Sequence, residues 1–429
     1  MASVSFPYGK EYQEISIPES RFAGVLNSGL HGYHAEKSGE ELIQEALRNP
    51  VGSAPLSELS RGKQKVVIIA SDHTRPVPSK VIIPAMLAEI RKGNPGAQIT
   101  ILIATGCHRE TTKEELIAKF GEEIFSKETI VVHDCDDREN LLSIGTLPSG
   151  GELVINRLAK EADLLVSEGF IEPHFFAGFS GGRKSVLPGI CSRSTVIYNH
   201  NASFIDSEYS RTGVLEGNPI HRDMVWAART AGLSFIVNVV LDEKKEPVYA
   251  VAGDMEEAHK KGCEFLAGLC GVKRKEADIV ITTNGGYPLD QNIYQAVKGM
   301  TAAEACVKQG GVTVMLARSN DGHGGQSFYE TFRDQPDLHE MMKEFLATPP
   351  GKTRIDQWQS QIFARVLMKS TVIYVSEAPD EMVRDLHMIP AGSLAEALRK
   401  ADEILLAKGI RDGSVLAIPD GVSVIVENR

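Results

Sequence analysis

The sequence predicts an α/β protein of two domains, each built on a mainly parallel sheet flanked by helices. Two observations lead to this fold class. Short β-branched runs alternate with helical stretches along most of the 429 residues, which is the order typical of parallel sheets covered on both faces. The chain is also too long for one core, since single cores rarely exceed about 250–300 residues.

A first series of elements lies within residues 1–270, which we take as an N-terminal domain. Its expected strands are 65–70, 98–104, 129–133 and 164–168, and its expected helices are 79–92 and 112–120. Two further runs, 235–241 and 247–252, are joined by a polar segment and indicate a hairpin inserted before the second series.

A second series begins after the charged segment 271–276 and predicts a C-terminal α/β domain over residues 278–410. Its expected strands are 278–282, 312–317 and 371–375, and its expected helices are 291–298 and 357–368. We expect the hinge between the domains at 271–277. The tail offers two more strands, so residues 411–429 either stay with this domain or return to the first.

Composition and charge exclude several classes of function. Acidic residues outnumber basic ones by 57 to 46, which disfavours a nucleic-acid partner. The N-terminus lacks the pattern of a signal peptide, and no apolar run approaches the roughly 20 residues of a membrane span. We therefore expect a cytoplasmic protein without a membrane partner. Its six scattered cysteines are expected to be thiols rather than a disulfide framework or a zinc site.

Polar residues gather in the loops that follow the expected strands. In open parallel sheets, ligands bind outside the carboxyl ends of the strands. The loops in question are 71–78, 105–110 and 172–185 in the first domain, and 284–291 in the second. We therefore look for the chemistry of the protein in these four segments.

The segment from Gly178 to Ser185 nearly matches a phosphate-binding P-loop. Arg183 stands where that motif requires its second glycine, and Pro188 would break the helix that should follow. A nucleotide-dependent kinase or ligase is accordingly the alternative function. Lys184 is either a covalent nucleophile in a partly desolvated pocket or a solvated loop cation.

Three histidines are candidates for chemistry. His108 and His174 fall just past expected strand ends, where two imidazoles can act as acid and base on opposite faces of one molecule, although each could merely hydrogen-bond its own loop. His200 could bind a metal, or it could be a structural histidine. It has no neighbouring protein ligand at helical spacing, so such a metal would take most of its ligands from elsewhere.

Two cations and two aromatic residues complete the candidates. The planar guanidinium of Arg75 can clamp a carboxylate or phosphate, or pair with Asp72. Lys298, at an expected helix end, either caps carbonyls or acts as a second cation. Tyr294 and Trp358 are first expected to be packing residues.

Taken together, these motifs closely resemble the nickel-dependent lactate racemase family (LarA). The likeness covers most of the chain, from Pro7 to beyond Trp358. Its five motifs, in order, are Ser71-Asp-His-Thr-Arg-Pro76, Thr-Gly-Cys-His108, Glu172-Pro-His174 running into Gly-Phe-Ser-Gly-Gly-Arg-Lys184, Asn199-His200-Asn, and Leu289-Asp-Gln-Asn-Ile-Tyr-Gln-Ala-Val-Lys298.

The resemblance implies two α/β domains around a cleft that holds the active site, with the cofactor bound by the N-terminal domain. The implied cofactor is pyridinium-3-thioamide-5-thiocarboxylic acid mononucleotide, which holds nickel as a pincer and is attached covalently at Lys184. His200 would supply the protein ligand to nickel. The implied cofactor-side contacts are Asp72, Thr74, Gly181 and Gly182.

The resemblance also implies the reaction, which is racemisation of a small 2-hydroxy acid such as lactate. A hydride would leave the substrate for the cofactor and return to the other face of a planar 2-keto acid. The partners implied are this substrate and separate enzymes of cofactor biosynthesis. By similarity His108 and His174 would be the alternate acid and base, Arg75 and Lys298 would hold the substrate carboxylate, and Tyr294, Gln295 and Trp358 would line the pocket.

Overall fold

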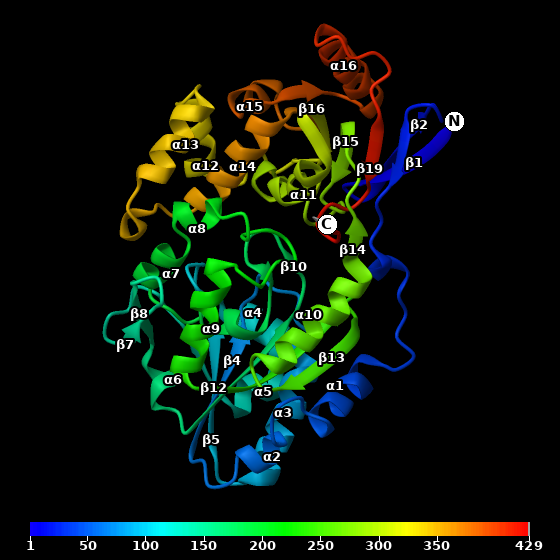
Figure 1. Cartoon of the computed structure of the whole chain (residues 1–429). Helices are drawn as coiled ribbons and strands as arrows, with labels where there is room; N and C mark the ends of the chain where they lie inside the picture. The colour runs from blue at the N-terminus through cyan, green and yellow to red at the C-terminus, as the bar shows by residue number, and fades with distance from the viewer. Residues whose placement is uncertain (428–429) are drawn as a thin grey trace. The chain divides into compact units, whose positions relative to one another are not determined.

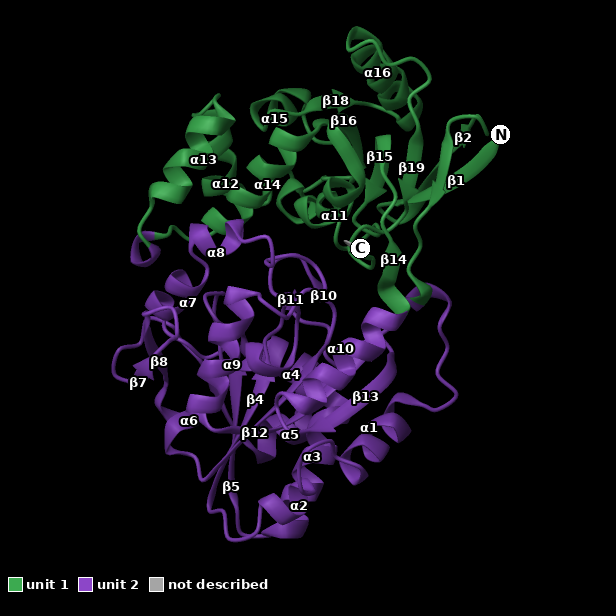
Figure 2. Cartoon of the chain, in the orientation of Figure 1, with its two compact units in different colours: residues 1–29, 269–349, 353–429 green, residues 30–268, 350–352 purple. Residues whose placement is uncertain are grey.

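The computed structural model describes residues 1–427, and the chain divides into two compact units (Figures 1 and 2). Unit 2 comprises residues 30–268 and 350–352. Unit 1 comprises residues 1–29, 269–349 and 353 onward. Within residues 1–427, no helix has the length and apolar character that crossing a membrane requires.

The centre of unit 2 is a six-stranded sheet with the order β13-β12-β9-β4-β5-β6. All neighbouring strands are parallel except the hairpin β12–β13. The expected strands of the first series are confirmed, and the expected hairpin is an edge of this sheet rather than a separate insertion. The strands are β4 (Lys65–Ser71), β5 (Gln98–Ala104), β6 (Thr129–Val132), β9 (Leu164–Phe170), β12 (Leu233–Leu241) and β13 (Pro247–Gly253).

Helices cover this sheet and begin where the sequence supplies caps. Ser38 with Glu41, and Thr112 with Glu115, form capping boxes at the starts of α1 and α4. Strand β9 is buried along its whole length, as expected of a central parallel strand. The helices are α1 (Gly39–Arg48), α2 (Leu56–Leu59), α3 (Ser79–Gly93), α4 (Lys113–Phe120), α5 (Glu122–Lys127), α6 (Arg157–Glu161), α7 (Arg193–Asn199), α8 (Ala202–Asp206), α9 (Pro219–Ala231) and α10 (Glu257–Cys270).

Short elements in the connections of unit 2 carry much of the site described below. The pairs β7–β8 and β10–β11 are both antiparallel. These elements are β7 (Leu141–Thr146), β8 (Glu152–Asn156), β10 (Pro173–His174), β11 (Gly178–Phe179) and the 3₁₀ turns η1 (Gly29–Gly32), η2 (Gly182–Ser185) and η3 (Pro350–Lys352).

Unit 1 is built on a second six-stranded sheet, of order β18-β17-β16-β15-β19-β3, in which every pair is parallel. The expected strands of the second series are confirmed as members of this sheet. Its strands are β3 (Phe22–Val25), β15 (Ala277–Thr283), β16 (Val307–Leu316), β17 (Thr371–Val375), β18 (Ile389–Ala391) and β19 (Val415–Ile418), and the smaller sheets of the unit pair β1 (Ala2–Tyr8) with β2 (Glu11–Ile17) and β14 (Gly271–Lys273) with β20 (Ile425–Glu427).

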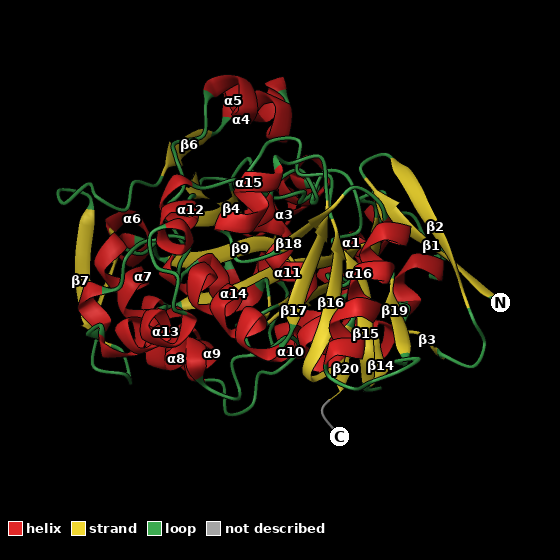
Figure 3. Ribbon diagram, turned by 90° about the horizontal axis from the view of Figure 1, so that it is seen from above, coloured by secondary structure: helices red, strands yellow, loops and turns green. Residues whose placement is uncertain are grey.

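Both faces of this second sheet are covered, as Figure 3 shows. Alternate residues of β15 point to opposite faces. Ile279 and Ile281 belong to a core shared with α16 and the β1–β2 hairpin, whereas Val280 belongs to a core shared with α11. The helices are α11 (Ile293–Cys306), α12 (Gln326–Arg333), α13 (Leu338–Ala347), α14 (Gln357–Lys369), α15 (Asp380–Asp385) and α16 (Leu394–Ala407).

The bounds of the units differ from the domains expected above. Residues 1–29 belong to unit 1, because β3 pairs with β19 near the other end of the chain. Residues 271–273, inside the expected hinge, form β14. Within the expected tail 411–429, the described strands β19 and β20 pair with β15 and β14 and so stay with the second series. Residues 428–429 of that tail lie outside the described residues.

Candidate active site

Asp72 directly follows β4 and is 1% exposed. Its Oδ1 accepts hydrogen bonds from the backbone N (3.1 Å) and Oγ1 (2.6 Å) of Thr74, which close the loop. Its Oδ2 lies 2.7 Å from Nδ1 of His108. Burial raises the pKa of this carboxyl, but the hydrogen bonds from His108 and Thr74 outweigh burial and hold the pKa below its ordinary value. Asp72 is therefore a buried anion.

His108 follows β5, the strand next to β4 in the sheet. Its backbone N donates to the carbonyl of Thr105 at 2.9 Å, and its side chain is 45% exposed. Since Nδ1 faces an anionic acceptor, that nitrogen carries a proton and Nε2 is the nitrogen that can exchange one. The pair with Asp72 thus fixes the orientation and the tautomer of an accessible acid–base group.

Arg75 is exposed in the same loop. Its Nη1 donates to Oγ1 of Thr74 at 3.1 Å, so the direct partner of Asp72 is His108 and not Arg75 as the sequence suggested. The carbonyl of Arg75 accepts from Nζ of Lys119 at 3.2 Å. A guanidinium held in this way can bind two oxygens of a carboxylate.

Glu168, near the end of β9, is a buried acid that sequence reasoning missed. It is 2% exposed, and its Oε1 accepts from Oγ of Ser79 at 2.6 Å and from Oγ of Ser71 at 3.3 Å. Its Oε2 has no hydrogen-bond partner among the described residues. Burial raises the pKa of this carboxyl. The available signal was an acidic residue inside an otherwise uncharged strand.

His174 and Lys184 meet on the segment that follows β9. Nζ of Lys184 lies 3.3 Å from Nε2 of His174, and the backbone N of Ala177 donates to Nδ1 of the same ring at 3.3 Å. Phe176 packs against both side chains, with its ring 4.5 Å from the His174 ring and 5.6 Å from the Lys184 ammonium position. Because Nδ1 accepts the hydrogen bond from Ala177, the neutral ring of His174 carries its proton on Nε2, the nitrogen that faces the amine of Lys184.

His200 caps the carboxyl end of α7 and is 4% exposed. Its Nδ1 lies 3.1 Å from the carbonyl of Val196, which can only accept, so Nδ1 carries the proton and Nε2 the lone pair. Burial, followed by the nearby charge of Lys184, lowers the pKa of His200 to about 3. A neutral imidazole with its second nitrogen fixed by a carbonyl is the usual state of a metal-binding histidine.

Arg183 is fully buried, at 0% exposure, and is the scaffold of this segment. Its Nη2 and Nη1 donate to the carbonyls of Ala177 and Phe179, both at 2.7 Å. Its Nε donates to Nδ1 of His221 at 3.0 Å, and its Nη1 lies 3.2 Å from Nε2 of His259. Burial lowers the pKa of Arg183 to about 10. A buried cation thus ties the backbone on both sides of β11 to two helices.

Gly181 and Gly182 have φ angles of +77° and +52°, a region that favours glycine. A Cβ at Gly181 would lie 2.7 Å from Oδ1 of Asn238, and one at Gly182 would lie 2.7 Å from the ring of His259. The same Oδ1 accepts from the backbone N of Gly182 at 2.8 Å. Glycine is required at these two positions because the side chains of Asn238 and His259 lie so close to the backbone.

The geometry does not support a P-loop. A P-loop opens directly into an α-helix whose first amides bind phosphate. Here Gly182–Ser185 is a four-residue 3₁₀ turn, and the next helix, α7, begins only at Arg193. Arg183, at the position of the missing glycine, points into the protein. The segment from Gly178 to Ser185 is therefore not a P-loop, and the kinase or ligase alternative was based on that motif.

The remaining predicted residues lie in unit 1. Tyr294, Gln295 and Lys298 are in the first turns of α11, which continues to Cys306, so Lys298 does not cap a helix end. The hydroxyl of Tyr294 donates to Oδ1 of Asp356 at 2.7 Å, a partner that the sequence did not indicate. Oε1 of Gln295 is buried without a hydrogen-bond partner among the described residues. Trp358 is half-buried near the start of α14.

In unit 2, Asp72, Arg75 and His108 lie in the loops after the neighbouring strands β4 and β5, and His174 and Lys184 lie in the segment after β9. The loops after β5 and β9 are joined by the backbone N of Gly106, which donates to the carbonyl of Gly189 at 2.9 Å, and the backbone N of Gly189 donates to the carbonyl of Lys184 at 3.2 Å. Among the predicted residues of unit 1, Tyr294, Gln295 and Lys298 lie in the first turns of α11.

The strands of the unit 2 sheet are followed by a carboxylate-bound imidazole and an imidazole–amine pair, at the edge of the sheet where α/β enzymes bind their ligands. Residues 8–213 match the family described as the lactate racemase N-terminal domain, and residues 272–426 match the lactate racemase C-terminal domain. The chain belongs to the lactate racemase family and is a racemase.

Lactate racemases match this chain over its full length in sequence and in structure. The chain is 53% identical over 430 residues to a lactate racemase of Thermoanaerobacterium thermosaccharolyticum and 52% identical over 428 residues to a lactate racemase of Lactiplantibacillus plantarum, with 100% of each chain covered. The solved lactate racemase apoprotein of T. thermosaccharolyticum matches with a TM-score of 0.95 at 52% identity over 100% of both chains. A crystal structure of a protein from Thermotoga maritima, at 19% identity and a TM-score of 0.62, covers 92% of this chain and shares the fold.

Proposed function

We propose that this racemase interconverts the enantiomers of lactate, or of a similar short 2-hydroxy acid, with a nickel-pincer nucleotide bound at Lys184 and His200. The observation that carries the proposal is the presence of two separately oriented imidazoles, His108 on Asp72 and His174 beside Lys184. When the hydride leaves and returns at C2, the hydroxyl proton must be taken up in one configuration and returned in the other, which two imidazoles can do. The names of the relatives support lactate as the substrate.

The residues of unit 2 fit such a cofactor. Imidazole nitrogen suits Ni²⁺, and the buried, neutral His200 with its proton on Nδ1 offers this donor at Nε2. Lys184 offers a primary amine for a covalent tether, and this amine lies against the rings of His174 and Phe176. His200 and Lys184 would therefore hold the group, and separate biosynthetic enzymes would supply it. When bound, the nickel-pincer nucleotide supplies a reversible acceptor for the hydride on C2 of the substrate.

The side chains of the protein perform the remaining work. The exposed guanidinium of Arg75 binds the substrate carboxylate, which fixes C2 and its hydroxyl. Nε2 of one catalytic histidine takes the hydroxyl proton as C2 becomes planar. The other histidine returns a proton to the carbonyl oxygen when C2 becomes tetrahedral with the opposite hand. Asp72 keeps His108 in the required tautomer throughout, since it accepts from Nδ1.

Chiral analysis of lactate incubated with cofactor-loaded protein tests the proposal. We expect either pure enantiomer to reach a mixture of both. A panel of other 2-hydroxy acids in the same assay defines the substrate. Loaded protein that leaves every member of the panel unchanged would contradict the proposed substrate class.

Mass spectrometry of the loaded protein tests the tether independently of activity. We expect a covalent adduct on the peptide that contains Lys184, together with about one nickel per chain. Lys184→Arg keeps the charge but removes the primary amine, so it is expected to lose the adduct. Lys160→Arg, on α6, is the matched control and should keep it. An unmodified Lys184 in active enzyme would contradict the proposed covalent tether.

A further inference from the structure

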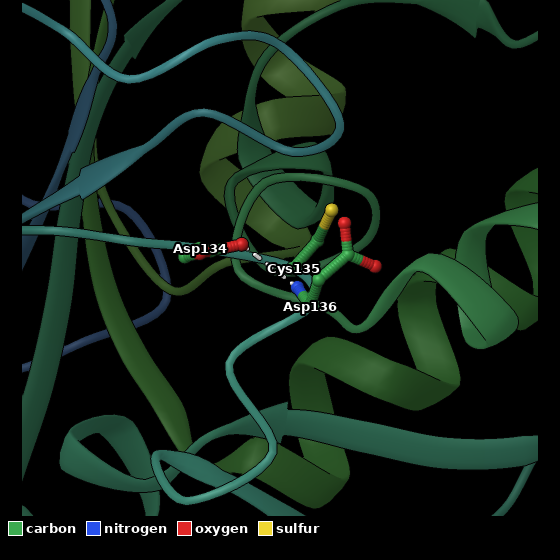
Figure 4. Close-up of side chains that lie close together, drawn as sticks. All are labelled: Asp134, Cys135 and Asp136. Atoms are coloured by element: carbon green, nitrogen blue, oxygen red, sulfur yellow. Dashed lines mark hydrogen bonds between the residues drawn. The ribbon is translucent and has the colours of Figure 1, made fainter.

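Two acidic features of unit 2 have no part in the mechanism proposed above. Asp134, Cys135 and Asp136 offer ligand atoms within 4.8 Å of one another (Figure 4). Nη2 and Nε of Arg193 donate to Oδ2 and Oδ1 of Asp136 at 2.7 and 2.9 Å, so the chain itself supplies a cation there. The second feature is Glu168, near the end of β9, whose buried Oε2 has no hydrogen-bond partner among the described residues. Burial of such a carboxyl group costs free energy.

Oε1 of Glu168 joins the two ends of the loop that carries Arg75. Ser71, the last residue of β4, donates to this oxygen from its backbone N at 3.4 Å and from its Oγ at 3.3 Å. Ser79, the first residue of α3, donates to it from Oγ at 2.6 Å. Residues 72–78 thus leave the sheet and enter the helix over one carboxyl oxygen, which closes the base of the loop.

The interior of the loop is also held in place. Val77 is 6% exposed and packs into the core of unit 2, and the rings of Pro76 and Pro78 on either side of it fix their φ angles. The backbone N of Arg75 donates to the carbonyl of Asp72 at 3.3 Å. The backbone of Arg75 is therefore fixed while its side chain remains exposed.

Lys119, in the last turn of α4, holds the middle of the loop. Its Nζ donates to the carbonyl of Arg75 at 3.2 Å. Burial lowers the pKa of Lys119, whereas the charges of Glu168 and Asp72 act in the opposite direction and favour the ammonium form. The helix that carries Lys119 follows the loop of His108, so this contact also connects the two loops of the site.

We propose that Glu168 is a positioning residue for Arg75, because it fixes both ends of the loop from which the guanidinium reaches the substrate carboxylate. Lys119 fixes the middle of the same loop. The inference rests on the carboxylate-binding role proposed for Arg75 above. A guanidinium binds two carboxylate oxygens only when it is correctly oriented, so a loosened loop weakens substrate binding. KM should therefore change more than kcat.

Kinetics of loaded enzyme with lactate test the role of the carboxyl group. Glu168→Ala removes the acceptor oxygen, and we expect KM to rise about tenfold while kcat changes by less than about twofold. Glu168→Gln keeps an oxygen that can accept from Ser71 and Ser79, so its KM should stay near that of the parent chain. An unchanged KM for the Ala variant, or a Gln variant no better than the Ala variant, would overturn the proposed anchoring.

Two further variants leave the carboxyl group in place and serve if the Ala variant does not fold. Ser79→Ala removes the 2.6 Å hydrogen bond at one end of the loop, and Lys119→Met removes the donor to the loop carbonyl. Each is expected to raise KM about threefold. Ser126→Ala and Lys113→Met, at exposed positions of α5 and α4, are the matched controls and should not change KM. Variants that behave like their controls would overturn the proposal.

A double-mutant cycle separates this inference from the proposed function. Arg75→Ala is expected to raise KM, and adding Glu168→Ala should then raise it little further, because the effect of Glu168 passes through Arg75. Full additivity would overturn that route. An Arg75→Ala variant with an unchanged KM would instead overturn the proposed role of Arg75 in the reaction, and the inference with it.

Hydrogen exchange of the full chain measures the anchoring without an activity assay. In Glu168→Ala we expect the amides of residues 72–78 to exchange severalfold faster than in the parent chain, because the base of the loop is no longer closed. The amides of α9, elsewhere in unit 2, are the internal control and should exchange as before. Unchanged exchange over residues 72–78 would overturn the proposed anchoring of the loop.

Discussion

Nδ1 of His108 lies 2.7 Å from Oδ2 of Asp72, and these two residues follow adjacent parallel strands of one sheet. The carboxylate is buried and the imidazole is half exposed. This arrangement gives the ring one fixed nitrogen and one reactive nitrogen, so Asp72 is a positioning residue for His108.

Replacement of Asp72 by Asn tests this positioning role. The amide keeps the shape of the side chain but can turn its NH₂ group to Nδ1, which would stabilise the wrong tautomer of His108. We expect kcat of loaded enzyme to fall about 10²-fold or more with little change in KM. The matched control is Asp163→Asn, at the opposite end of the sheet, where the carboxylate accepts only from backbone amides of Gln64 and Lys65. An unaltered kcat and pH profile for Asp72→Asn would remove Asp72 from the mechanism.

Replacement of Arg183 by Lys is expected to destabilise unit 2. A single ammonium cannot serve the carbonyls and imidazoles that the buried guanidinium now joins. Breaking a buried charge network costs about 3–5 kcal/mol, so the free energy of unfolding in urea should fall by roughly this amount. Arg138→Lys, on an exposed loop, is the control and should change stability little. A loss for Arg183→Lys no larger than that of the control would show that the network contributes little.

Stability is expected to fall in mild acid because of three buried histidines. Burial holds the pKa of His200 and of His221 at about 3, and the pKa of His259 well below its ordinary value. Below pH 6.5 the unfolded chain binds protons at these residues while the folded chain does not, so the stabilising contribution present above pH 6.5 is lost as pH falls towards 3. Each histidine contributes a slope of about 1.4 kcal/mol per pH unit. Urea unfolding at several pH values measures the slope.

His221→Gln is the sharpest variant for this pH dependence. Its amide oxygen can accept from Nε of Arg183 in place of Nδ1 of the ring, and it does not titrate. Between pH 6 and 5, the slope of the free energy of unfolding against pH should decrease by about 1.4 kcal/mol per pH unit, which corresponds to one proton. If the variant and the parent chain lose stability in parallel, His221 is not one of the groups responsible.

Replacement of Glu168 by Gln is expected to have an effect of opposite sign. Because burial raises the pKa of Glu168 in the folded state, its contribution to stability is complete below its ordinary value and is lost as pH rises through the raised value. Gln keeps an oxygen to accept from Ser79 and Ser71 and has no charge to bury. The stability of the variant relative to the parent should therefore increase between pH 5 and 8. A constant difference would indicate that Glu168 stays ionised.

All strands of the unit 2 sheet, and all strands of the unit 1 sheet except β3 and β18, were predicted from local pattern, as were the loops that carry the candidate residues. Successive parallel strands place their carboxyl ends together, which is why Asp72 and His108, on loops after neighbouring strands, could be expected near one another. The sequence suggested Arg75 as the partner of Asp72, because Arg75 is only three residues away in the same loop. The distance of 2.7 Å assigns that partner to His108.

The buried charges could not be predicted. Arg183 and Glu168 are of residue types that are usually exposed, and hydrophobic periodicity says nothing about a polar side chain that turns inward. The bounds of the units could not be predicted from the sequence either, because Phe22 of β3 pairs with Val415 of β19. No local pattern reports a contact between residues so far apart in the chain.

That pairing has a consequence for synthesis on the ribosome. Strand β3 leaves the ribosome long before its neighbour β19, whereas residues 30–268 hold nearly all of unit 2 in one continuous stretch. Unit 2 can therefore reach its native state during translation, while β3 exposes unpaired backbone groups until β19 leaves the exit tunnel. A chain truncated before residue 415 would leave this strand permanently without its neighbour and prone to associate with other chains.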